Sequence, residues 1–306
     1  MAAPILITGG SGQLAVALEA AAASHDLTVR RVGRPMLDFD RPTSIAEVFA
    51  DIAPWLVVNA AAYTAVDQAE DEPDAANRAN CDGPAELGRL CEAAGIPLIH
   101  VSTDYVFDGR KGVPYVETDA TAPQGVYGAS KLAGERAVVT GCSRAIVLRT
   151  SWVYSPVGKN FVRTMLSVAQ RTDKLRVVAD QIGCPTSSAD LAQAILDIAG
   201  KLSAGGWQDR YGGVYHAAGS GWTSWHGLAT ETFAAASRHG TAIPTVDPIT
   251  TDEWPTKAIR PPDSRLDCSK LEAVFGLRLP PWQEGLATAI DTIFATAASP
   301  ALQTAR

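Results

Sequence analysis

The chain has 306 residues, and its 46% hydrophobic and 19% charged side chains are typical of a folded globular protein rather than a disordered one. Its 33 acidic residues outnumber its 26 basic ones and give a net charge of −7, which argues against nucleic-acid binding but not against a small anionic ligand. Five widely spaced cysteines without a Cys-x-x-Cys pair indicate reduced thiols, and no apolar run is long enough for a membrane span, so we expect a cytoplasmic protein.

The first predicted element is a short apolar strand at residues 5–7, and an alanine-rich helix starts near Leu14. The turn between them, residues 8–12, is the setting in which a glycine-rich loop binds a dinucleotide. Gly9 permits a tight turn, Gly12 lets the backbone approach a pyrophosphate, and the free N–H groups of the helix N-terminus favour its negative charge. The alternative is an ordinary strand–turn–helix connection that contains glycines.

The end of the second predicted strand bears on the choice of cofactor. NAD-selective folds place an acidic residue about 20 positions beyond the glycine loop, where it binds the ribose 2′-hydroxyl. Counting on from Gly12 reaches Val32, which offers no carboxylate and lies among arginines. A guanidinium suits a 2′-phosphate, and Arg34, in the following loop, is the best placed, so we expect NADPH to be preferred over NADH. The alternative is that the arginines only solvate the strand end, since Asp38 lies nearby.

Strands and helices alternate through the first half of the chain. After the first strand, further apolar strands are predicted at residues 27–32, 55–59, 96–101 and 145–149. One helix is predicted from a cap at Thr43 or Ser44 to residue 50, and another from 74 to 94, interrupted near Gly83 and closed by Gly95. Nearly continuous apolar strands that alternate with helices are typical of a parallel sheet covered on both faces. The expected fold class is α/β, with a Rossmann-type doubly wound parallel sheet.

A proton-transfer unit is predicted between residues 99 and 137. One strand leads into Thr103, and Tyr127 and Lys131 open a helical segment. Positions four apart share a helix face, so the phenol and the ammonium can point into one site, where the lysine would lower the pKa of the phenol. The Thr103 hydroxyl could hydrogen-bond the same phenol. This combination is typical of a general acid–base catalyst, although the spacing also occurs in ordinary exposed helix pairs.

The pattern changes after residue 153. We expect an NAD(P)-binding Rossmann domain at residues 1–153 and a smaller, mainly substrate-binding lobe at 154–306, with the ligand crevice between them. Residues 187–220 are expected to return to the first domain. The elements predicted in the second half are helices at 161–170, 188–199 and 282–297 and strands at 175–179 and 213–218. The remainder, rich in Pro and Trp, is predicted to be irregular.

An ordered set of motifs spans nearly the whole chain: Gly12-Gln13-Leu14, VNAAAYTAVDQAE (58–70), STDYVFDG (102–109), ETDATAPQGVYGASKLAGE (117–135), LRTSWVY (148–154), DQIGCPT (180–186) and RPPDSRL (260–266). On these motifs the chain resembles the extended short-chain dehydrogenases/reductases and, within them, the dTDP-4-dehydrorhamnose reductase family. The resemblance implies hydride transfer from NADPH, with NADH possible, to the C4 ketone of dTDP-4-dehydro-L-rhamnose. The product, dTDP-L-rhamnose, would serve cell-surface polysaccharide (lipopolysaccharide, O-antigen) synthesis.

The resemblance also implies residue roles, which join the glycine loop and Arg34 argued above. Tyr127 would be the proton donor, Lys131 would hold the nicotinamide ribose, and Thr103 would hydrogen-bond the reacting oxygen or the tyrosine. The expected cofactor-binding residues are Gly9, Gly12, Gln13, Leu14, Arg34, Asp38, Phe39, Ala62, Tyr63, Thr64, Tyr127 and Lys131. The expected substrate-binding residues are Thr103, Asp104, Tyr127, Trp152, Arg260, Ser264 and Arg265. Arg265 has an alternative as a surface partner of Asp263 or Asp267.

Rival functions stay open at this point. A sugar-nucleotide dehydratase of this fold would place a glutamate after the Thr-Asp pair, where Tyr105 stands, and an epimerase is a further possibility. A non-catalytic regulatory subunit, resembling the β subunit of methionine adenosyltransferase, would have no need of the predicted catalytic residues. Some relatives hold a divalent metal between two subunits, but Glu19 and Asp190 do not match its ligand positions, so no metal is expected. The chain is expected to be a monomer or homodimer without nucleic-acid or membrane partners.

Overall fold

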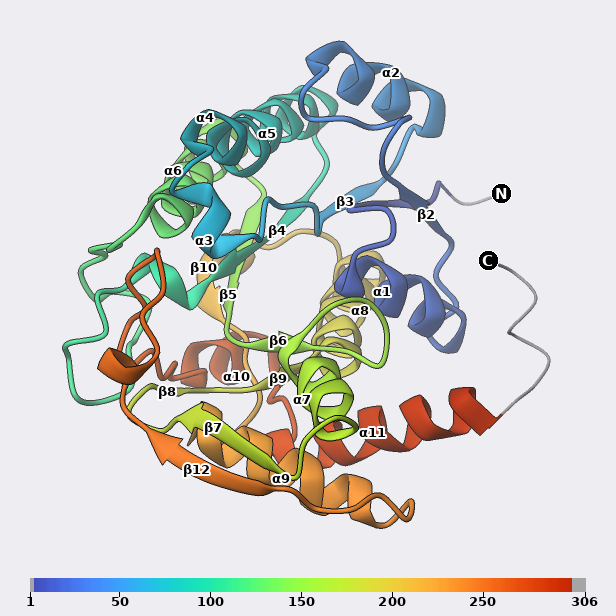
Figure 1. The fold of residues 1–306 in the computed structure, drawn as a ribbon. Helices are drawn as coiled ribbons and strands as arrows, with labels where there is room; N and C mark the ends of the chain where they lie inside the picture. Colours follow the sequence, from blue (N-terminus) through green and yellow to red (C-terminus); the bar gives the residue numbers. More distant parts are fainter. Residues whose placement is uncertain (1–2, 299–306) are drawn as a thin grey trace.

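The computed structural model describes residues 3–298 and contains a six-stranded parallel sheet with helices on both faces (Figure 1). The strands run in the order β10-β5-β4-β3-β1-β2, and every neighbouring pair is parallel. Their bounds are β1 Ile5–Thr8, β2 Val29–Val32, β3 Leu56–Asn59, β4 Leu98–Thr103, β5 Ala145–Thr150 and β10 Gly213–His216. This topology confirms the predicted Rossmann-type sheet, including the return of the strand near residue 213.

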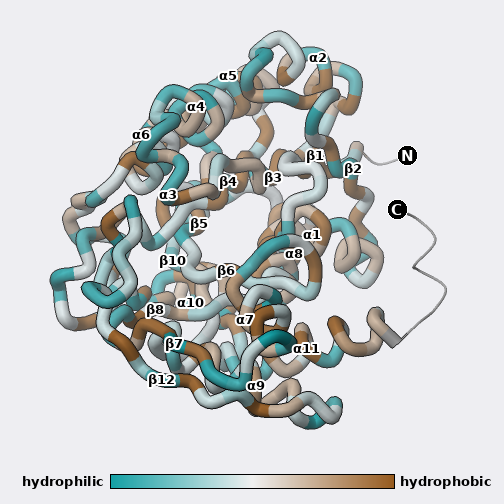
Figure 2. Tube along the Cα trace, in the orientation of Figure 1, coloured by the Kyte–Doolittle hydropathy of each residue, from teal (hydrophilic) through white to brown (hydrophobic). Residues whose placement is uncertain are grey.

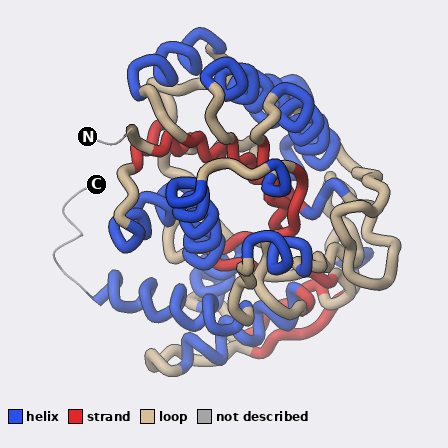
Figure 3. The backbone as a smooth tube through the Cα atoms, turned by 180° about the vertical axis from the view of Figure 1, so that it is seen from behind, coloured by secondary structure: helices blue, strands red, loops and turns tan. Residues whose placement is uncertain are grey.

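Different helices cover the two faces of the sheet, because successive strand residues point to opposite sides. On one face, Leu6, Val57, Leu98 and Val147 form a core beneath α2, α5 and α6. On the other face, the core includes residues of α1, α8 and α10. The bounds are α1 Gln13–Ala22, α2 Pro42–Ile52, α5 Gly83–Ala94, α6 Val126–Gly141, α8 Ser188–Gly205 and α10 Ser269–Phe275. Seen from behind, helices flank the strands of the main sheet (Figure 3). In Figure 2, hydrophilic and hydrophobic residues alternate along α2, as expected for a half-buried helix.

The second half of the chain adds three small sheets of two strands each. β12 pairs with β7 and β9 with β6 in parallel, whereas β11 pairs with β8 antiparallel. The strand bounds are β6 Val153–Tyr154, β7 Lys174–Val178, β8 Ile182–Gly183, β9 Thr186–Ser187, β11 Thr223–Ser224 and β12 Thr245–Ile249. The remaining helices are α3 Val66–Ala69, α4 Pro73–Asn77, α7 Phe161–Ala169, α9 Trp225–Ser237 and α11 Trp282–Ala298. Within residues 3–298 no helix is both long and apolar enough to cross a membrane.

Some local predictions are wrong. The region after residue 218 is not irregular, since it contains α9, β12 and α10 before the final helix. Neither Thr43 nor Ser44 caps α2, because Pro42 occupies its first turn and the helix starts after Arg41. Ser44 instead lies inside the helix, where its hydroxyl donates to backbone oxygens. The helix predicted to end at 199 continues to Gly205.

The predicted interruption near Gly83 is a π-helical turn at Arg78–Asp82, between α4 and α5. This turn directs the Asn80 carbonyl oxygen at α6, where a Cβ built on Gly134 would lie only 1.9 Å from it. Gly134 therefore allows a close backbone approach that no other residue permits. The approach matters because α6 carries the predicted catalytic residues.

We expect Gly134→Ala to lower the free energy of unfolding by about 1–3 kcal/mol, the range of overpacked cores, because the new methyl group would overlap the Asn80 carbonyl. Gly141→Ala, in the same helix, is the matched control, since a Cβ there meets nothing within 4 Å. The control should be neutral or stabilising by up to about 1 kcal/mol. Denaturant unfolding measures both, and equal effects of the two variants would contradict the close approach.

Candidate active site

The glycine loop lies at the carboxyl end of β1, where the strand order reverses between β2 and β3. Open parallel sheets bind their ligands at this reversal. Gly9 has a φ of +105°, and a Cβ there would lie 3.0 Å from the Ala60 carbonyl group. A Cβ on Gly33 would lie 2.5 Å from the Gly10 Cα. The glycine loop, the segment after β2 and the segment after β3 thus meet so closely that Gly9 and Gly33 leave no room for a side chain. Gly12 is exposed at the start of α1, where backbone N–H groups can receive an anion.

The other predicted cofactor residues of this region differ in what they can offer. Gln13 accepts a hydrogen bond from the Asn160 side chain (2.9 Å), which ties the glycine loop to the start of α7. Leu14 and Phe39 are buried in the two cores, and the Phe39 ring lies against Gly83. Only the backbone of Leu14 and Phe39 is therefore in a position to contact a ligand.

The segment 62–64 is held by Asn80, a residue that the sequence analysis missed. The Asn80 amide accepts from the Tyr63 N–H (2.8 Å) and donates to the Tyr63 carbonyl (3.1 Å), and it also donates to Ser130 on α6 (3.0 Å). The side chain of Tyr63 donates to Glu72. The position of Asn80 just before the expected helix interruption was the available signal, but its partners are distant in the sequence.

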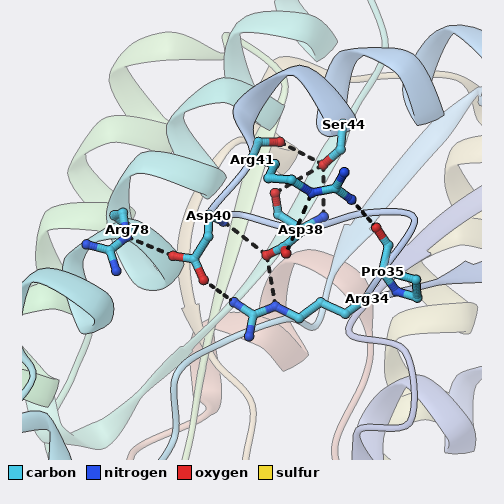
Figure 4. A network of polar contacts seen from close by, with 7 residues as sticks. All are labelled: Arg34, Pro35, Asp38, Asp40, Arg41, Ser44 and Arg78. Carbon is cyan, nitrogen blue, oxygen red and sulfur yellow. Dashed lines mark hydrogen bonds and ion pairs between the residues drawn. The ribbon is translucent and has the colours of Figure 1, made fainter.

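Arg34, the residue predicted to bind a 2′-phosphate, lies in a network of charged side chains (Figure 4). Its guanidinium is exposed and donates to Asp38 (2.8 Å) and to Asp40 (2.5 Å). Arg78 bonds the same Asp40 carboxylate (2.7 Å), and Arg41 donates to the Pro35 carbonyl. Arg78 and Arg34 keep the pKa of Asp40 below its ordinary value, Arg78 contributing most. Arg34 is therefore already shared with two carboxylates, and its contact with a cofactor phosphate stays a prediction.

Two of the predicted proton-transfer residues, Tyr127 and Lys131, lie in the first part of α6, and the third, Thr103, ends β4. Glu70 accepts the first N–H of this helix, that of Val126 (2.8 Å), so the helix begins at a fixed point. Lys131 is buried and its Nζ donates to the Val101 carbonyl of β4 (2.6 Å). Thr103, at the end of β4, lies close enough to the Tyr127 phenol to act on its pKa, while its hydroxyl donates to Asp104 (3.1 Å). Lys131 and Thr103 therefore both lie at β4, and the meeting of the Tyr127 phenol with the Lys131 ammonium stays a prediction.

The expected direction of the Tyr127 pKa is wrong. Burial raises the pKa of Tyr127 to about 12, with the hydrogen bond to Thr103 acting in the opposite direction. Burial also lowers the pKa of Lys131 to about 8, against the attraction of Glu135. Both shifts have one cause, since removal from water disfavours the charged form of either group. The phenol is thus protonated near neutral pH and can donate its proton.

Asp104 is buried next to Thr103 and accepts hydrogen bonds from hydroxyl groups of both halves of the chain. Ser151 donates to one oxygen (3.0 Å) and Thr103 to the other (3.1 Å), and Ser264 contributes a third. Burial nevertheless raises the pKa of Asp104 to about 6. Ser264 reaches this site because the Ser264 N–H and the Ile182 carbonyl are hydrogen-bonded (2.8 Å). The two predicted substrate residues, Asp104 and Ser264, are therefore in contact.

The remaining predicted substrate residues, Trp152, Arg260 and Arg265, differ in the contacts that their side chains make. Trp152 stacks on Trp225, with ring centroids 3.6 Å apart. Arg260 donates to Asp67 (2.8 Å), while its Nη1 is buried without a partner among the described residues. Arg265 is paired with Asp263 (2.6 Å), which matches the alternative of a pair with Asp263, and its role in substrate binding stays a prediction.

Within residues 3–298, no group of three or more His, Cys, Asp or Glu side chains is arranged to hold a metal ion.

Comparison with known proteins gives a consistent result. The family model of the RmlD substrate binding domain matches residues 3–294. A dTDP-4-dehydrorhamnose reductase of Sinorhizobium fredii is 46% identical over 280 residues, covering 92% of this chain and 94% of that protein. The crystal structure of a dTDP-4-dehydrorhamnose reductase from Clostridium acetobutylicum superposes with a TM-score of 0.87 at 35% identity, covering 95% of this chain and 99% of that one. A Bacillus anthracis dTDP-4-dehydrorhamnose reductase solved with NADP has a TM-score of 0.85 at 33% identity, covering 97% and 100%.

The Asp104 environment predicts a pH dependence of stability. Its pKa of about 6 lies above the ordinary 3.8, so the folded state holds this proton more tightly than the unfolded state. Stability should therefore fall as the pH rises from about 4 to about 6, and wild type should lose up to about 3 kcal/mol relative to Asp104→Asn over that range.

Chemical denaturation of both proteins at several pH values measures this difference. Asp119 is the control of opposite sign, because Lys111 keeps the pKa of Asp119 below its ordinary value. Relative to Asp119→Asn, wild type should gain stability as the pH rises. A pH-independent difference for Asp104→Asn would show that this carboxyl group is not desolvated.

Proposed function

Because the chain belongs to the dTDP-4-dehydrorhamnose reductase family, we propose that it reduces the C4 ketone of dTDP-4-dehydro-L-rhamnose to give dTDP-L-rhamnose, with NADPH as the hydride donor. The observation that supports this proposal is the match to the family over nearly the whole chain, which includes an enzyme solved with NADP. It is supported further by the anchoring of Lys131 at β4 and by the proximity of Tyr127 to Thr103 at the end of that strand. The product would serve cell-surface polysaccharide synthesis.

The cofactor fits the first half of the chain. The backbone approach at Gly9 and the exposed start of α1 at Gly12 suit a pyrophosphate. The nicotinamide, when bound, supplies the hydride. Lys131 would hold the ribose hydroxyls, and its ammonium is anchored by a hydrogen bond to the Val101 carbonyl (2.6 Å). NADH would be accepted less well, because Arg34 gives a 2′-phosphate a cationic partner that it does not give a hydroxyl.

Tyr127 would donate its proton to the oxygen at C4 as the hydride arrives on the carbon. Thr103 would orient that oxygen or the phenol. The phenolate that remains is stabilised by the neighbouring ammonium of Lys131, and the proton is regained from solvent after product release. A phenol with a pKa of about 12 stays protonated until a substrate oxygen that develops negative charge accepts the proton.

The substrate would lie between residues of both halves of the chain, a Rossmann domain at 1–153 and a mainly substrate-binding lobe at 154–306. Asp104 and Ser264 would contact the sugar, and Trp152, Arg260 and Arg265 would contact the sugar or its nucleotide. The buried free Nη1 of Arg260 suits an anionic group such as a diphosphate. We further propose a cytoplasmic enzyme that works as a monomer or homodimer.

Tyr127→Phe should lose about 10²–10⁴-fold in kcat while keeping its affinity for NADPH, because positioned acid catalysis is removed and the ring remains. Turnover of dTDP-4-dehydrorhamnose is followed by the loss of reduced nicotinamide absorbance, and cofactor affinity by fluorescence titration. Tyr105→Phe is the matched control, since this second ring lies 5.4 Å from Tyr127 and should retain most activity. A Tyr127→Phe enzyme with wild-type turnover would place the acid elsewhere.

We expect Arg34 to influence the choice between NADPH and NADH. Wild type should prefer NADPH over NADH in kcat/KM, and Arg34→Ala should reduce the ratio by about 5- to 10-fold, because one charge-assisted hydrogen bond to phosphate is lost. Asp40→Asn should increase the ratio, since it removes a carboxylate that shares Arg34 and repels phosphate. Arg30→Ala, which also removes one positive charge, serves as the control for a general change in the charge of the protein. An unchanged ratio in Arg34→Ala would contradict the assignment.

A further inference from the structure

A row of buried polar side chains crosses three neighbouring strands on the face covered by α6. Thr8, Asn59 and His100 are register partners on β1, β3 and β4, and each is 0% exposed. Thr8 donates to the Asn59 Oδ1 (2.6 Å), and the Asn59 Nδ2 contacts the Nδ1 of His100 (2.9 Å). Thr8 in turn accepts from the backbone N–H of Ala61 (3.2 Å). The row thus links β4 to β1, which leads into the glycine loop, and to the end of β3 and the segment that follows it.

The row fixes the proton on His100. Because the Asn59 oxygen accepts from Thr8, its amide nitrogen must donate to the Nδ1 of His100, which leaves the proton of a neutral imidazole on Nε2. This Nε2 is buried and has no hydrogen-bond partner among residues 3–298. A buried N–H without an acceptor costs on the order of 1–3 kcal/mol, so such groups are nearly always satisfied by protein or bound water.

Lys131 lies on the helix that covers this row. Its Nζ donates to the carbonyl of Val101, the residue after His100, and Ser102, on the same face of β4 as His100, donates to Glu135 one helical turn further along α6 (2.5 Å). Burial keeps the pKa of His100 well below the ordinary value, and the positive charge of Lys131 lowers it further. Two buried donors, an imidazole N–H and an ammonium, therefore face the same small region.

We propose that His100 is a positioning residue for Lys131, and that one bound water accepts a hydrogen bond from His100 Nε2 and another from Lys131 Nζ. The water completes the coordination of both donors and holds the ammonium at the depth at which it meets the cofactor ribose. The inference rests on the proposed function through the role of Lys131, but the water and the imidazole tautomer exist independently of the substrate.

The other groups around Lys131 leave this role to His100. Glu135, on the same helix, raises the pKa of Lys131, but its carboxylate is held in a buried pair with Arg149 of β5 (2.7 Å). Tyr127 on α6 is a protonated phenol. The carboxyl group of Asp104, after β4, already accepts hydrogen bonds from hydroxyl groups. From the π turn, the neutral side-chain amide of Asn80 donates to Ser130 of α6 (3.0 Å).

The molecule contains a matched control in His216 of β10. Like His100 it is 0% exposed, and its Nε2 is buried without a partner in the described part of the chain. Its Nδ1 donates to the Asp267 carbonyl (3.1 Å), so its Nε2 is an acceptor, whereas the Nε2 of His100 carries the proton. Burial and the nearby charge of Arg149 lower its pKa. Its neighbouring cation is Arg149 and not Lys131, so substitution of His216 removes a buried imidazole without the positioning effect.

The experiment compares His100→Phe, His100→Gln and His216→Phe by pH profiles, taken both for kcat/KM and for the dissociation constant of NADPH. In His100→Phe the ammonium loses a water ligand, so the basic limb assigned to Lys131, whose pKa is about 8, should move to lower pH by about half a unit or more. His100→Gln should restore most of the shift through its amide N–H. His216→Phe should lose comparable thermal stability and keep the wild-type limb.

A limb that stays in place in His100→Phe, or moves equally in His216→Phe, would overturn the proposal. If His100→Phe does not fold, a high-resolution crystal structure of the wild-type protein decides, because density for a water within hydrogen-bond distance of both nitrogens supports the proposal and its absence refutes it. The NADPH titration separates the two levels of inference. A wild-type protein that binds NADPH with this pH dependence but does not turn over the sugar nucleotide would refute the proposed function alone.

Discussion

The buried ion pair between Glu135 and Arg149 is the interaction on which the arrangement of the site depends. Arg149 donates through two nitrogens to both oxygens of Glu135 (2.9 and 2.7 Å), and Ser102 donates to the same carboxylate. Removing one partner of such a pair leaves an uncompensated buried charge, at a cost of about 3–5 kcal/mol. The pair therefore allows α6 only one rotation about its axis relative to β4 and β5. With that rotation set, Lys131 reaches the Val101 carbonyl of β4, and Tyr127 lies near Thr103 at the end of the same strand.

The same burial governs the chemistry of the site. It raises the pKa of Tyr127 and lowers that of Lys131, so that a protonated phenol stands beside an ammonium that is closer to losing its proton than a lysine in water. It also raises the pKa of Asp104, although three hydroxyl groups bond this carboxylate. An enzyme of this kind needs a proton donor that holds its proton until charge develops on the substrate, and desolvation provides that property without a specialised residue.

The sequence predicts well what depends on local pattern. The apolar strands, the glycine loop and the four-residue spacing of Tyr127 and Lys131 led to the correct fold class and family, because each is set by neighbours along the chain. What it could not give depends on packing between distant segments. The Tyr127 pKa was predicted in the wrong direction, since spacing shows which groups are near but not how much water is excluded. Asn80 and His100 were not predicted as functional residues, because their hydrogen-bond partners lie far away in the sequence.

The most direct test of the central claim is to trace the transferred hydride. The wild-type protein is incubated with dTDP-4-dehydro-L-rhamnose and NADPH that carries deuterium at both C4 positions of the dihydronicotinamide, and the product is analysed by NMR. The account predicts dTDP-L-rhamnose with deuterium bound to C4 of the sugar and stoichiometric formation of NADP. Recovery of unreduced sugar nucleotide with unoxidised NADPH, or a reduced product without deuterium at C4, would contradict it.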